Sequence, residues 1–299
     1  MKKFIAYLPY KPQKISRQLL TATTVLYLFC GTALAGDTSH RFTLGADAMR
    51  YTYTESTDTT PKLMSLKSNQ FGGYAAYTLS QDDWFFKPEA TLNYGYAKYD
   101  NWRHPQYMGA SEITWLFEGR LLGGYDFKIL DDLTLSPYIG IGYKHRSEDD
   151  QLTDDVAHGK RDDTERSLRV NRSWYIPIGI KARYDFTPQW FITGTIEYDH
   201  RFWGKHYDYA KQMAPSPLIF NQHKAYGIQG ELMLGRHFEK NTLEVGPYFA
   251  WWKATKSNKI NSKKYIRGRL GMEEEWESNG SYEPSNTICC LGLRLRVTI

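Results

Sequence analysis

Apolar and polar residues alternate along most of this chain with a period of two. The last segment shows the pattern clearly, because Leu291, Leu293 and Leu295 fall in one row while Arg294 and Arg296 fall in the other. Successive side chains of a β-strand point to opposite faces, so such a segment has one apolar and one polar face. A soluble sheet turns the apolar face to a core, whereas a membrane barrel turns it to lipid.

Ten segments carry this alternation, and we predict a strand in each of them. No apolar run of about 18 residues follows the first 35 residues, which argues against membrane-spanning helices. The predicted strands cover residues 40–54, 69–80, 84–99, 112–128, 133–146, 172–186, 190–203, 223–238, 242–255 and 287–299.

The links between the predicted strands alternate between short and long. Tight turns follow every second strand, at residues 81–83, 129–132, 187–189 and 239–241. Long polar links follow the others, at residues 55–68, 100–111, 147–171, 204–222 and 256–286. Bacterial outer-membrane barrels are organised in this way, and a β-sandwich has no reason to be. The sequence therefore predicts an all-β fold, a closed antiparallel transmembrane β-barrel of about ten strands with short periplasmic turns and long extracellular loops.

The inward-facing rows of these strands carry charges of both signs. A lumen of eight to ten strands is narrow enough for side chains to fill, and unpaired charges inside it would be costly. We therefore expect a paired network rather than a wide diffusion channel. The charged inward residues are Glu89, Glu118, Arg120, Lys181, Arg183, Glu197, Glu231, Arg294 and Arg296.

The first 35 residues have the features of a signal peptide. A basic leader precedes a mostly apolar stretch over 19–34, and Ala33-Leu34-Ala35 matches the small-x-small cleavage pattern. We expect a signal peptide over 1–35 and an outer-membrane barrel over 36–299, located in the bacterial outer membrane. Its partners would be outer-membrane lipid, lipopolysaccharide and the barrel-assembly machinery.

The net charge of +5 comes from that leader. It holds five basic and no acidic residues, so 33 basic residues balance 33 acidic ones in the remainder. The chain after residue 35 therefore has no excess of positive charge that would favour a nucleic-acid partner.

Cys289 and Cys290 are adjacent and point to opposite faces, so they are poorly placed to form a disulfide. No cofactor or metal is expected, because the acidic third link (147–171) matches no calcium-loop spacing.

The fifth long link divides by charge. Four glutamates follow its basic residues, within 273–277. Either the basic arm binds polyanions such as glycosaminoglycans or lipopolysaccharide, or the two arms neutralise one another. The basic residues are Lys256, Lys259, Lys263, Lys264, Arg267 and Arg269.

Titratable residues gather where the second and fourth long links leave the strands. Asp100 lies at the second link, and Asp199, His206 and Asp208 lie at or in the fourth. A histidine facing a carboxylate across such a rim could activate water for hydrolysis. Solvated loop residues would show the same pattern, so both interpretations stay open.

The chain resembles the omptin family of ten-stranded outer-membrane proteases. The order of strands and links matches over most of the chain after residue 35. The local matches are residues 102–105 (Trp-Arg-His-Pro), 175–179 (Tyr-Ile-Pro-Ile-Gly), 194–198 and 206–208 (His-Tyr-Asp).

The resemblance implies a catalytic site, which is incomplete here. Omptins place two aspartates in the second-loop region opposite an Asp-x-His in the fourth loop. Asp100 matches one member of the first pair and His206 matches the histidine, but Gly204 stands where the orienting aspartate belongs. Asp208 or Asp199 would have to replace it. The resemblance also places Tyr143 and Arg172 at a lipopolysaccharide site on the outer rim.

Two hypotheses about function follow. In the first, the chain is a non-enzymatic surface barrel, an adhesin or binding protein whose long loops contact a host surface ligand. In the second, it is an omptin-like endopeptidase that acts on peptides through Asp100, His206 and Asp208 or Asp199. The incomplete catalytic pattern favours the first.

Overall fold

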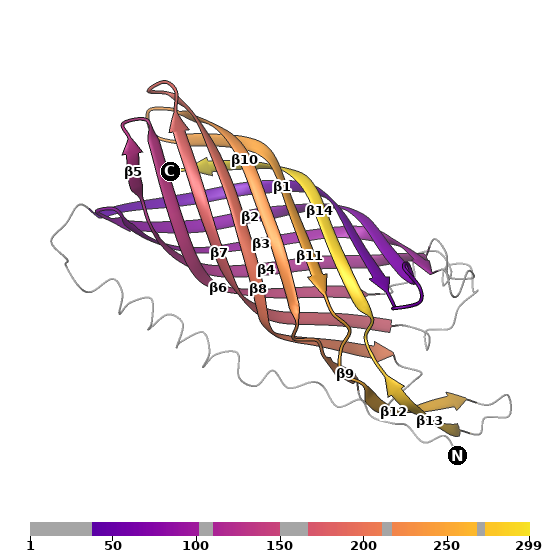
Figure 1. Ribbon diagram of the computed structural model, residues 1–299. Coiled ribbons are helices and arrows are strands. Elements are labelled where there is room, and N and C mark those ends of the chain that lie inside the picture. The colour runs from indigo at the N-terminus through magenta and orange to yellow at the C-terminus, as the bar shows by residue number, and fades with distance from the viewer. Residues whose placement is uncertain (1–37, 102–109, 150–166, 211–216, 268–272) are drawn as a thin grey trace, which may run out of the picture. The chain divides into compact units, whose positions relative to one another are not determined.

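The structure is a computed structural model of the 299-residue chain. It describes residues 38–101, 110–149, 167–210, 217–267 and 273–299 (Figure 1). Among these residues there is no helix that is long and apolar enough to cross a membrane.

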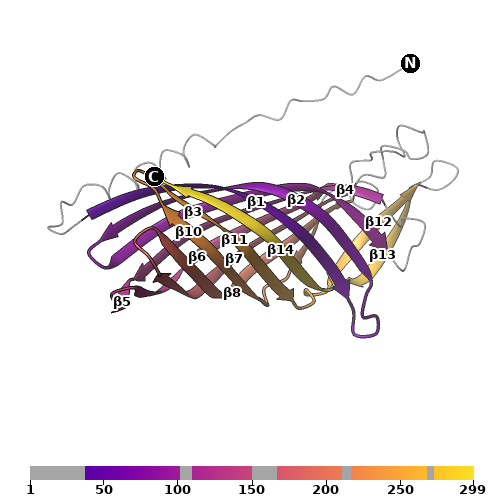
Figure 2. The same cartoon turned by 90° about the horizontal axis from the view of Figure 1, so that it is seen from above.

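Ten strands close into one antiparallel barrel. Going round the ring, the order is β1-β2-β3-β4-β6-β7-β8-β10-β11-β14, and the pairing of β14 with β1 closes it. The first and last strands lie side by side (Figure 2). The ten strands are β1 (Thr38–Ser56), β2 (Met64–Gln81), β3 (Trp84–Asn101), β4 (Ala110–Tyr125), β6 (Leu133–Asp149), β7 (Ser167–Asp185), β8 (Trp190–Ala210), β10 (Ala225–His237), β11 (Thr242–Ala254) and β14 (Ser285–Thr298).

Four short strands supplement the ring. β5 (Phe127–Leu130) pairs with β6 beyond the end of β4, and β9 (Leu218–Asn221) pairs with the last part of β8. β12 (Ile260–Arg267) and β13 (Glu273–Ser281) form a separate hairpin in the fifth long link. The barrel therefore has short turns at one end, the turn end, and extended elements at the other, the long-loop end.

The ten predicted strands and the closed barrel are confirmed, but several strands extend further at the long-loop end than predicted. β7 begins at Ser167 rather than at 172, and β8 continues to Ala210 rather than ending at 203. The prediction ended each strand where its apolar row ended. Backbone pairing continues beyond that point, through outward residues that are polar. Lys205, for example, still pairs with Arg172 of β7.

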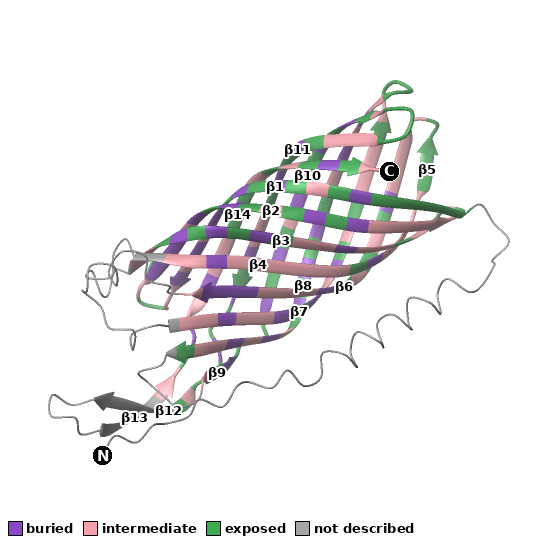
Figure 3. Ribbon diagram, turned by 180° about the vertical axis from the view of Figure 1, so that it is seen from behind, coloured by how far each residue is buried: buried purple, intermediate pink, exposed green. Residues whose placement is uncertain are grey.

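The barrel is apolar outside and polar inside. Leu291 and Leu293 on the outer face are 62% and 61% exposed, whereas Arg296 on the inner face of the same strand is 8% exposed. Exposed and buried positions alternate along the strands (Figure 3). An apolar outer wall of this extent needs lipid rather than water around it.

Charged residues mark where this apolar wall ends at the long-loop end. The outward rows carry Arg50 on β1, Lys67 on β2, Arg172 on β7 and Lys205 on β8. Charged side chains on a lipid-facing surface are tolerated near the interfaces and costly at the midplane. The strand residues beyond these positions therefore stand outside the membrane-spanning segments.

Candidate functional site

Ion networks cross the middle of the lumen. Arg120 on β4 binds Glu89 on β3, and its Nη1 lies 2.6 Å from Oε1 of Glu197 on β8. Because β8 is three places from β4 in the ring, this pair bridges strands that do not touch. Glu231 on β10 accepts a hydrogen bond of 3.1 Å from Arg294 on β14. For these residues the predicted paired network is confirmed.

A second polar cluster lies at the long-loop end, beyond the apolar wall. The hydroxyl of Tyr53 donates to Glu55 at 2.9 Å and to Glu283 at 3.2 Å. Nε2 of His206 lies 3.6 Å from Glu283, and Arg169 lies 3.6 Å from Glu55. β1 and β7 are five places apart in the ring, so the Arg169–Glu55 contact spans the whole lumen.

Local structure explains how these groups meet. Tyr53 and Glu55 are two residues apart on β1, so both side chains point inward. Glu283 lies just before β14, and its backbone exchanges hydrogen bonds with Ser257: the Ser257 N–H donates to the Glu283 carbonyl at 2.9 Å, and the Glu283 N–H donates to the Ser257 hydroxyl at 2.8 Å. These bonds hold the two ends of the fifth link together, which fixes the position of the Glu283 carboxyl above the lumen.

Burial sets the protonation of this cluster. Burial, reinforced by the charge of Glu283, raises the pKa of Glu55 to about 8. Burial also raises the pKa of Glu283 to about 7, against the opposing effect of Arg169 and Arg146. Burial, reinforced by the positive charges of Arg169 and Arg146, lowers the pKa of His206 to about 3. At neutral pH the histidine is therefore uncharged, and the Glu55 carboxyl is mostly protonated.

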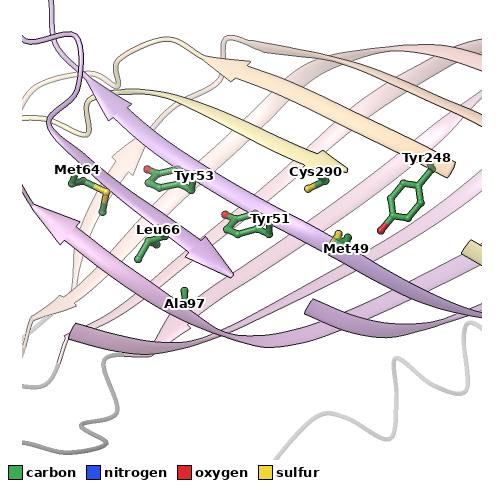
Figure 4. Close-up of a cluster of buried hydrophobic side chains, with 8 residues drawn as sticks. All are labelled: Met49, Tyr51, Tyr53, Met64, Leu66, Ala97, Tyr248 and Cys290. Atoms are coloured by element: carbon green, nitrogen blue, oxygen red, sulfur yellow. The ribbon is translucent and has the colours of Figure 1, made fainter. Parts of the chain in front are cut away.

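An apolar cluster lies beneath these groups. It is formed by buried side chains from β1, β2, β3, β11 and β14 (Figure 4). Arg146 reaches it from β6, with its guanidinium carbon 4.1 Å from the centre of the Tyr53 ring and its Nη1 3.3 Å from the Tyr51 hydroxyl. The lumen at this level is filled by side chains. The cluster comprises Met49, Tyr51, Tyr53, Met64, Leu66, Ala97, Tyr248 and Cys290.

The predicted catalytic residues do not come together. Asp100 continues the outward row of β3, and its carboxylate lies 3.7 Å from Lys67 on the outer row of β2. His206 is on the inner row of β8 and is only 2% exposed. The two side chains therefore lie on opposite faces of the barrel wall. Residues 102–109 of the second link lie outside the described residues.

The other two predicted carboxylates are separated as well. Asp208 follows His206 on the inner row of β8, and it stands opposite Arg169 in the β7–β8 register. Asp199 lies deeper in the lumen, fully buried, and accepts a hydrogen bond of 2.6 Å from Gln229. Of the four predicted residues, only His206 and Asp208 lie near the rim on the same face of the same strand, the inner face of β8.

Sequence reasoning missed the other charged members of the cluster that contains His206. Glu55 could have been found, because the inward row of β1 continues through Tyr51 and Tyr53 to it. Glu283 lies in a segment predicted as a polar loop, and nothing in its local pattern marks it as buried. Arg169 belongs to the part of β7 that the prediction assigned to the third link.

The predicted lipopolysaccharide residues lie on the outer wall at the edge of the apolar band. The Tyr143 and Trp174 rings are 5.0 Å apart, and the Arg172 guanidinium stands 5.2 Å from the Tyr207 ring centre. These residues belong to β6, β7 and β8. We refer to the group as the outer-wall patch. It comprises Tyr143, Arg172, Trp174 and Tyr207, together with the stacked pair Trp115 and His145.

The fifth link contains the β12–β13 hairpin. Its basic arm pairs with its acidic arm in register, with Lys263 opposite Glu277 and Arg267 opposite Glu273. Near its base, exposed Lys256 forms a 3.0 Å ion pair with Asp58 of the first link, and Lys259 is exposed. Nothing is described of the side chains of Lys263, Lys264 and Arg267, and Arg269 lies outside the described residues.

A family model agrees with this architecture. The model of the autotransporter beta-domain matches residues 29–224. The chain belongs to the autotransporter beta-domain family. It is thus an outer-membrane β-barrel, and bacterial outer membrane is its location. No curated protein matches the sequence.

Solved structures add fold likeness only. The outer membrane protease OmpT from Escherichia coli is similar to this autotransporter beta-domain chain with a TM-score of 0.52 at 12% identity, over 90% of this chain and 99% of OmpT. The translocator domain of autotransporter NalP from Neisseria meningitidis gives 0.37 at 11% identity, over 93% and 95%. The Ralstonia pickettii toluene transporter TbuX gives 0.35 at 10% identity, over 87% and 88%. The omptin resemblance therefore remains a prediction.

The buried carboxyls predict how stability depends on pH. Their folded pKa values lie above the ordinary value of 4.5, so their contribution is complete below about pH 4.5 and is lost as pH rises through about 7 to 8. Glu283→Gln keeps a hydrogen-bonding side chain and cannot ionise. We expect the unfolding temperature of the wild type to fall between pH 5 and 9, and that of the variant to fall less.

Tryptophan fluorescence of the refolded barrel in detergent measures this. One proton accounts for a slope of at most about 1.4 kcal/mol per pH unit. Glu239→Gln, at an exposed turn, is the matched control and should follow the wild type. Equal slopes in Glu283→Gln and wild type would contradict the assignment.

Proposed function

We propose that this protein is a non-enzymatic surface barrel that binds partners through the elements at its long-loop end. The observation that carries the proposal is the placement of Asp100 and His206 on opposite faces of the wall. General-base hydrolysis needs a histidine and a carboxylate on one cleft, within reach of the same water. The two groups that the omptin resemblance would pair are not arranged in that way.

The surroundings of His206 also support a structural role. Its Nε2 faces Glu283, its ring lies 6.1 Å from that of Phe220, and the pair is enclosed by groups from β1, β7 and β8. A substrate would have to displace these contacts to reach the imidazole. The cluster joins the base of the fifth link to the barrel wall, which would hold the loops in place for binding.

The lumen is equally unsuited to passing a substrate. Side chains cross it at the level of Arg120 and again at Arg146 and Arg169. What the barrel offers to an external ligand is therefore its long-loop end, including the β12–β13 hairpin. We propose that this end faces the cell exterior and that a host surface ligand is bound there.

Proteolysis tests the proposal against the endopeptidase alternative. The refolded barrel would be assayed with and without lipopolysaccharide on fluorogenic peptides that include dibasic sites. We expect no cleavage under conditions in which a known omptin is active. Cleavage that is lost in Asp100→Ala and in His206→Ala, but retained in His200→Ala, would overturn the proposal. His200 is the matched control, because it is on the same strand and exposed on the outer face.

We further propose that the outer-wall patch binds lipopolysaccharide. It combines aromatic rings with the Arg172 guanidinium at the limit of the apolar band, where lipid headgroups would lie. Tyrosine and tryptophan favour that interface, and arginine binds phosphate in a bidentate manner. The patch thus offers both an apolar contact for acyl chains and a charge for headgroup phosphates.

Substitution of Arg172 tests this partner. Arg172→Ala should weaken binding of fluorescent lipopolysaccharide to the detergent-solubilised barrel about fivefold, given the modest energy of an exposed ion pair. Arg236→Ala is the matched control. Arg236 also stands over an aromatic ring, at 5.1 Å from Trp190, but it lies at the turn end. Equal losses in both variants, or no loss in either, would contradict a site at the patch.

A further inference from the structure

A small cavity remains in the lumen between the Arg120 network and the Glu55–Glu283 cluster. This central cavity has a volume of about 130 Å³, and a separate cavity of about 290 Å³ opens at the turn end. Arg201, Trp252, Tyr248 and Lys144 line the central cavity. Figure 4 labels Tyr248 among the inward side chains at this level.

Arg201 is the unusual member of this lining. It is 7% exposed, and its Nε and Nη2 have no hydrogen-bond partner among the described residues. Among the described residues, no carboxylate forms an ion pair with Arg201. A buried cation without a partner is strongly destabilising.

Three other cations on the lining, Lys144, Arg146 and Arg294, are paired with carboxylates, and Lys253 is exposed on the outer row of β11. Lys144 lies 3.3 Å from Glu118, and the Arg146 Nε lies 3.1 Å from Glu148. These two pairs leave no carboxylate for Arg201. Among the buried cations that the structure describes around the cavity, Arg201 therefore lacks a counter-charge.

Asp199, two residues before Arg201 on the same inner row, does not supply the missing charge. Its carboxylate accepts the 2.6 Å hydrogen bond from Gln229, and it forms no ion pair with Arg201. Asp199 is also absent from the residues that line the cavity. The closest candidate counter-charge in sequence thus points elsewhere.

Two further polar groups on the lining lack partners. Trp252 and Tyr248 are 8% and 7% exposed. Neither the Trp252 indole N–H nor the Tyr248 hydroxyl has a hydrogen-bond partner among the described residues. An indole N–H and a guanidinium can only donate. A species that satisfies them must bring acceptors, and a negative charge would also neutralise Arg201.

We propose that this cavity binds one small oxyanion, a carboxylate or phosphate group, held by Arg201 and the Trp252 N–H. Its volume is well below the roughly 300–1,000 Å³ of pockets for drug-sized ligands, so the occupant is small. Several waters would fit too, since each needs only about 10–15 Å³ of such volume. Water would leave the guanidinium charge unneutralised, which is why an anion is the better occupant.

Anion titrations test the site. Acetate and phosphate would be added separately to the refolded barrel in detergent, with ionic strength held constant by a bulky sulfonate buffer salt. The readouts are the unfolding temperature and the intrinsic tryptophan fluorescence, to which Trp252 contributes. We expect at least one of the two anions to give a saturable rise in unfolding temperature and a saturable fluorescence change. The two arms show whether the site prefers a carboxylate or a phosphate.

Variants locate the response. Arg201→Lys keeps the charge but loses the fork of donors, so binding should be about tenfold weaker. Arg201→Met should abolish the response, and Arg236→Met at the turn end should keep it. Slower gel migration after heating verifies that each variant was folded. A wild type without a saturable response to either anion means that only water fills the cavity, and a response retained in Arg201→Met places the anion elsewhere. Either result overturns the proposal.

Discussion

An arginine that points into this barrel has left bulk water and must find its counter-charge on another strand. Lipid requires the outer face to be apolar, so the polar row of every strand is turned into a narrow lumen. Arg120 meets Glu89 on the next strand and Glu197 three places away, and Tyr138 donates to the same Glu197 at 2.8 Å. These contacts fill the lumen and join strands that are not neighbours in the ring.

The same constraint governs the long-loop end, where function was expected. Glu55 and Arg169 meet across the full lumen, and Tyr53 holds Glu283 and Glu55 together. His206 is drawn into this arrangement and becomes a buried, neutral partner of a carboxyl. Residues that would suit catalysis at an open rim therefore serve to close the barrel and to anchor the fifth link. This arrangement supports the proposal that the long-loop end binds a partner rather than catalyses a reaction.

Most of the fold could be predicted from the sequence, because alternation identifies the strands and link length identifies the two ends. The far ends of β7 and β8 could not, since their ladders continue through polar residues that break the apolar row. The site was harder still. Alternation shows that His206 faces inward, but which residue it meets depends on how strands far apart in the ring are staggered. Glu283, on a segment without alternation, was beyond reach.

The ion networks of the lumen do not extend to Arg201. Arg201 lies between two filled levels, and no carboxylate among the residues that the structure describes forms an ion pair with it. Its presence suggests that the interior was not selected for stability alone, because an apolar side chain of similar volume would be cheaper to bury.

Conductance across a planar lipid bilayer tests the central claim most directly. If paired side chains fill the lumen at successive levels, the inserted wild-type barrel should show no steady open-channel current. Removing the crossing group in Arg120→Ala should introduce current or transient openings. A stable ohmic channel in the wild type would contradict the account, because ions could then pass the levels of Arg120, Arg146 and Arg169 that it describes as closed.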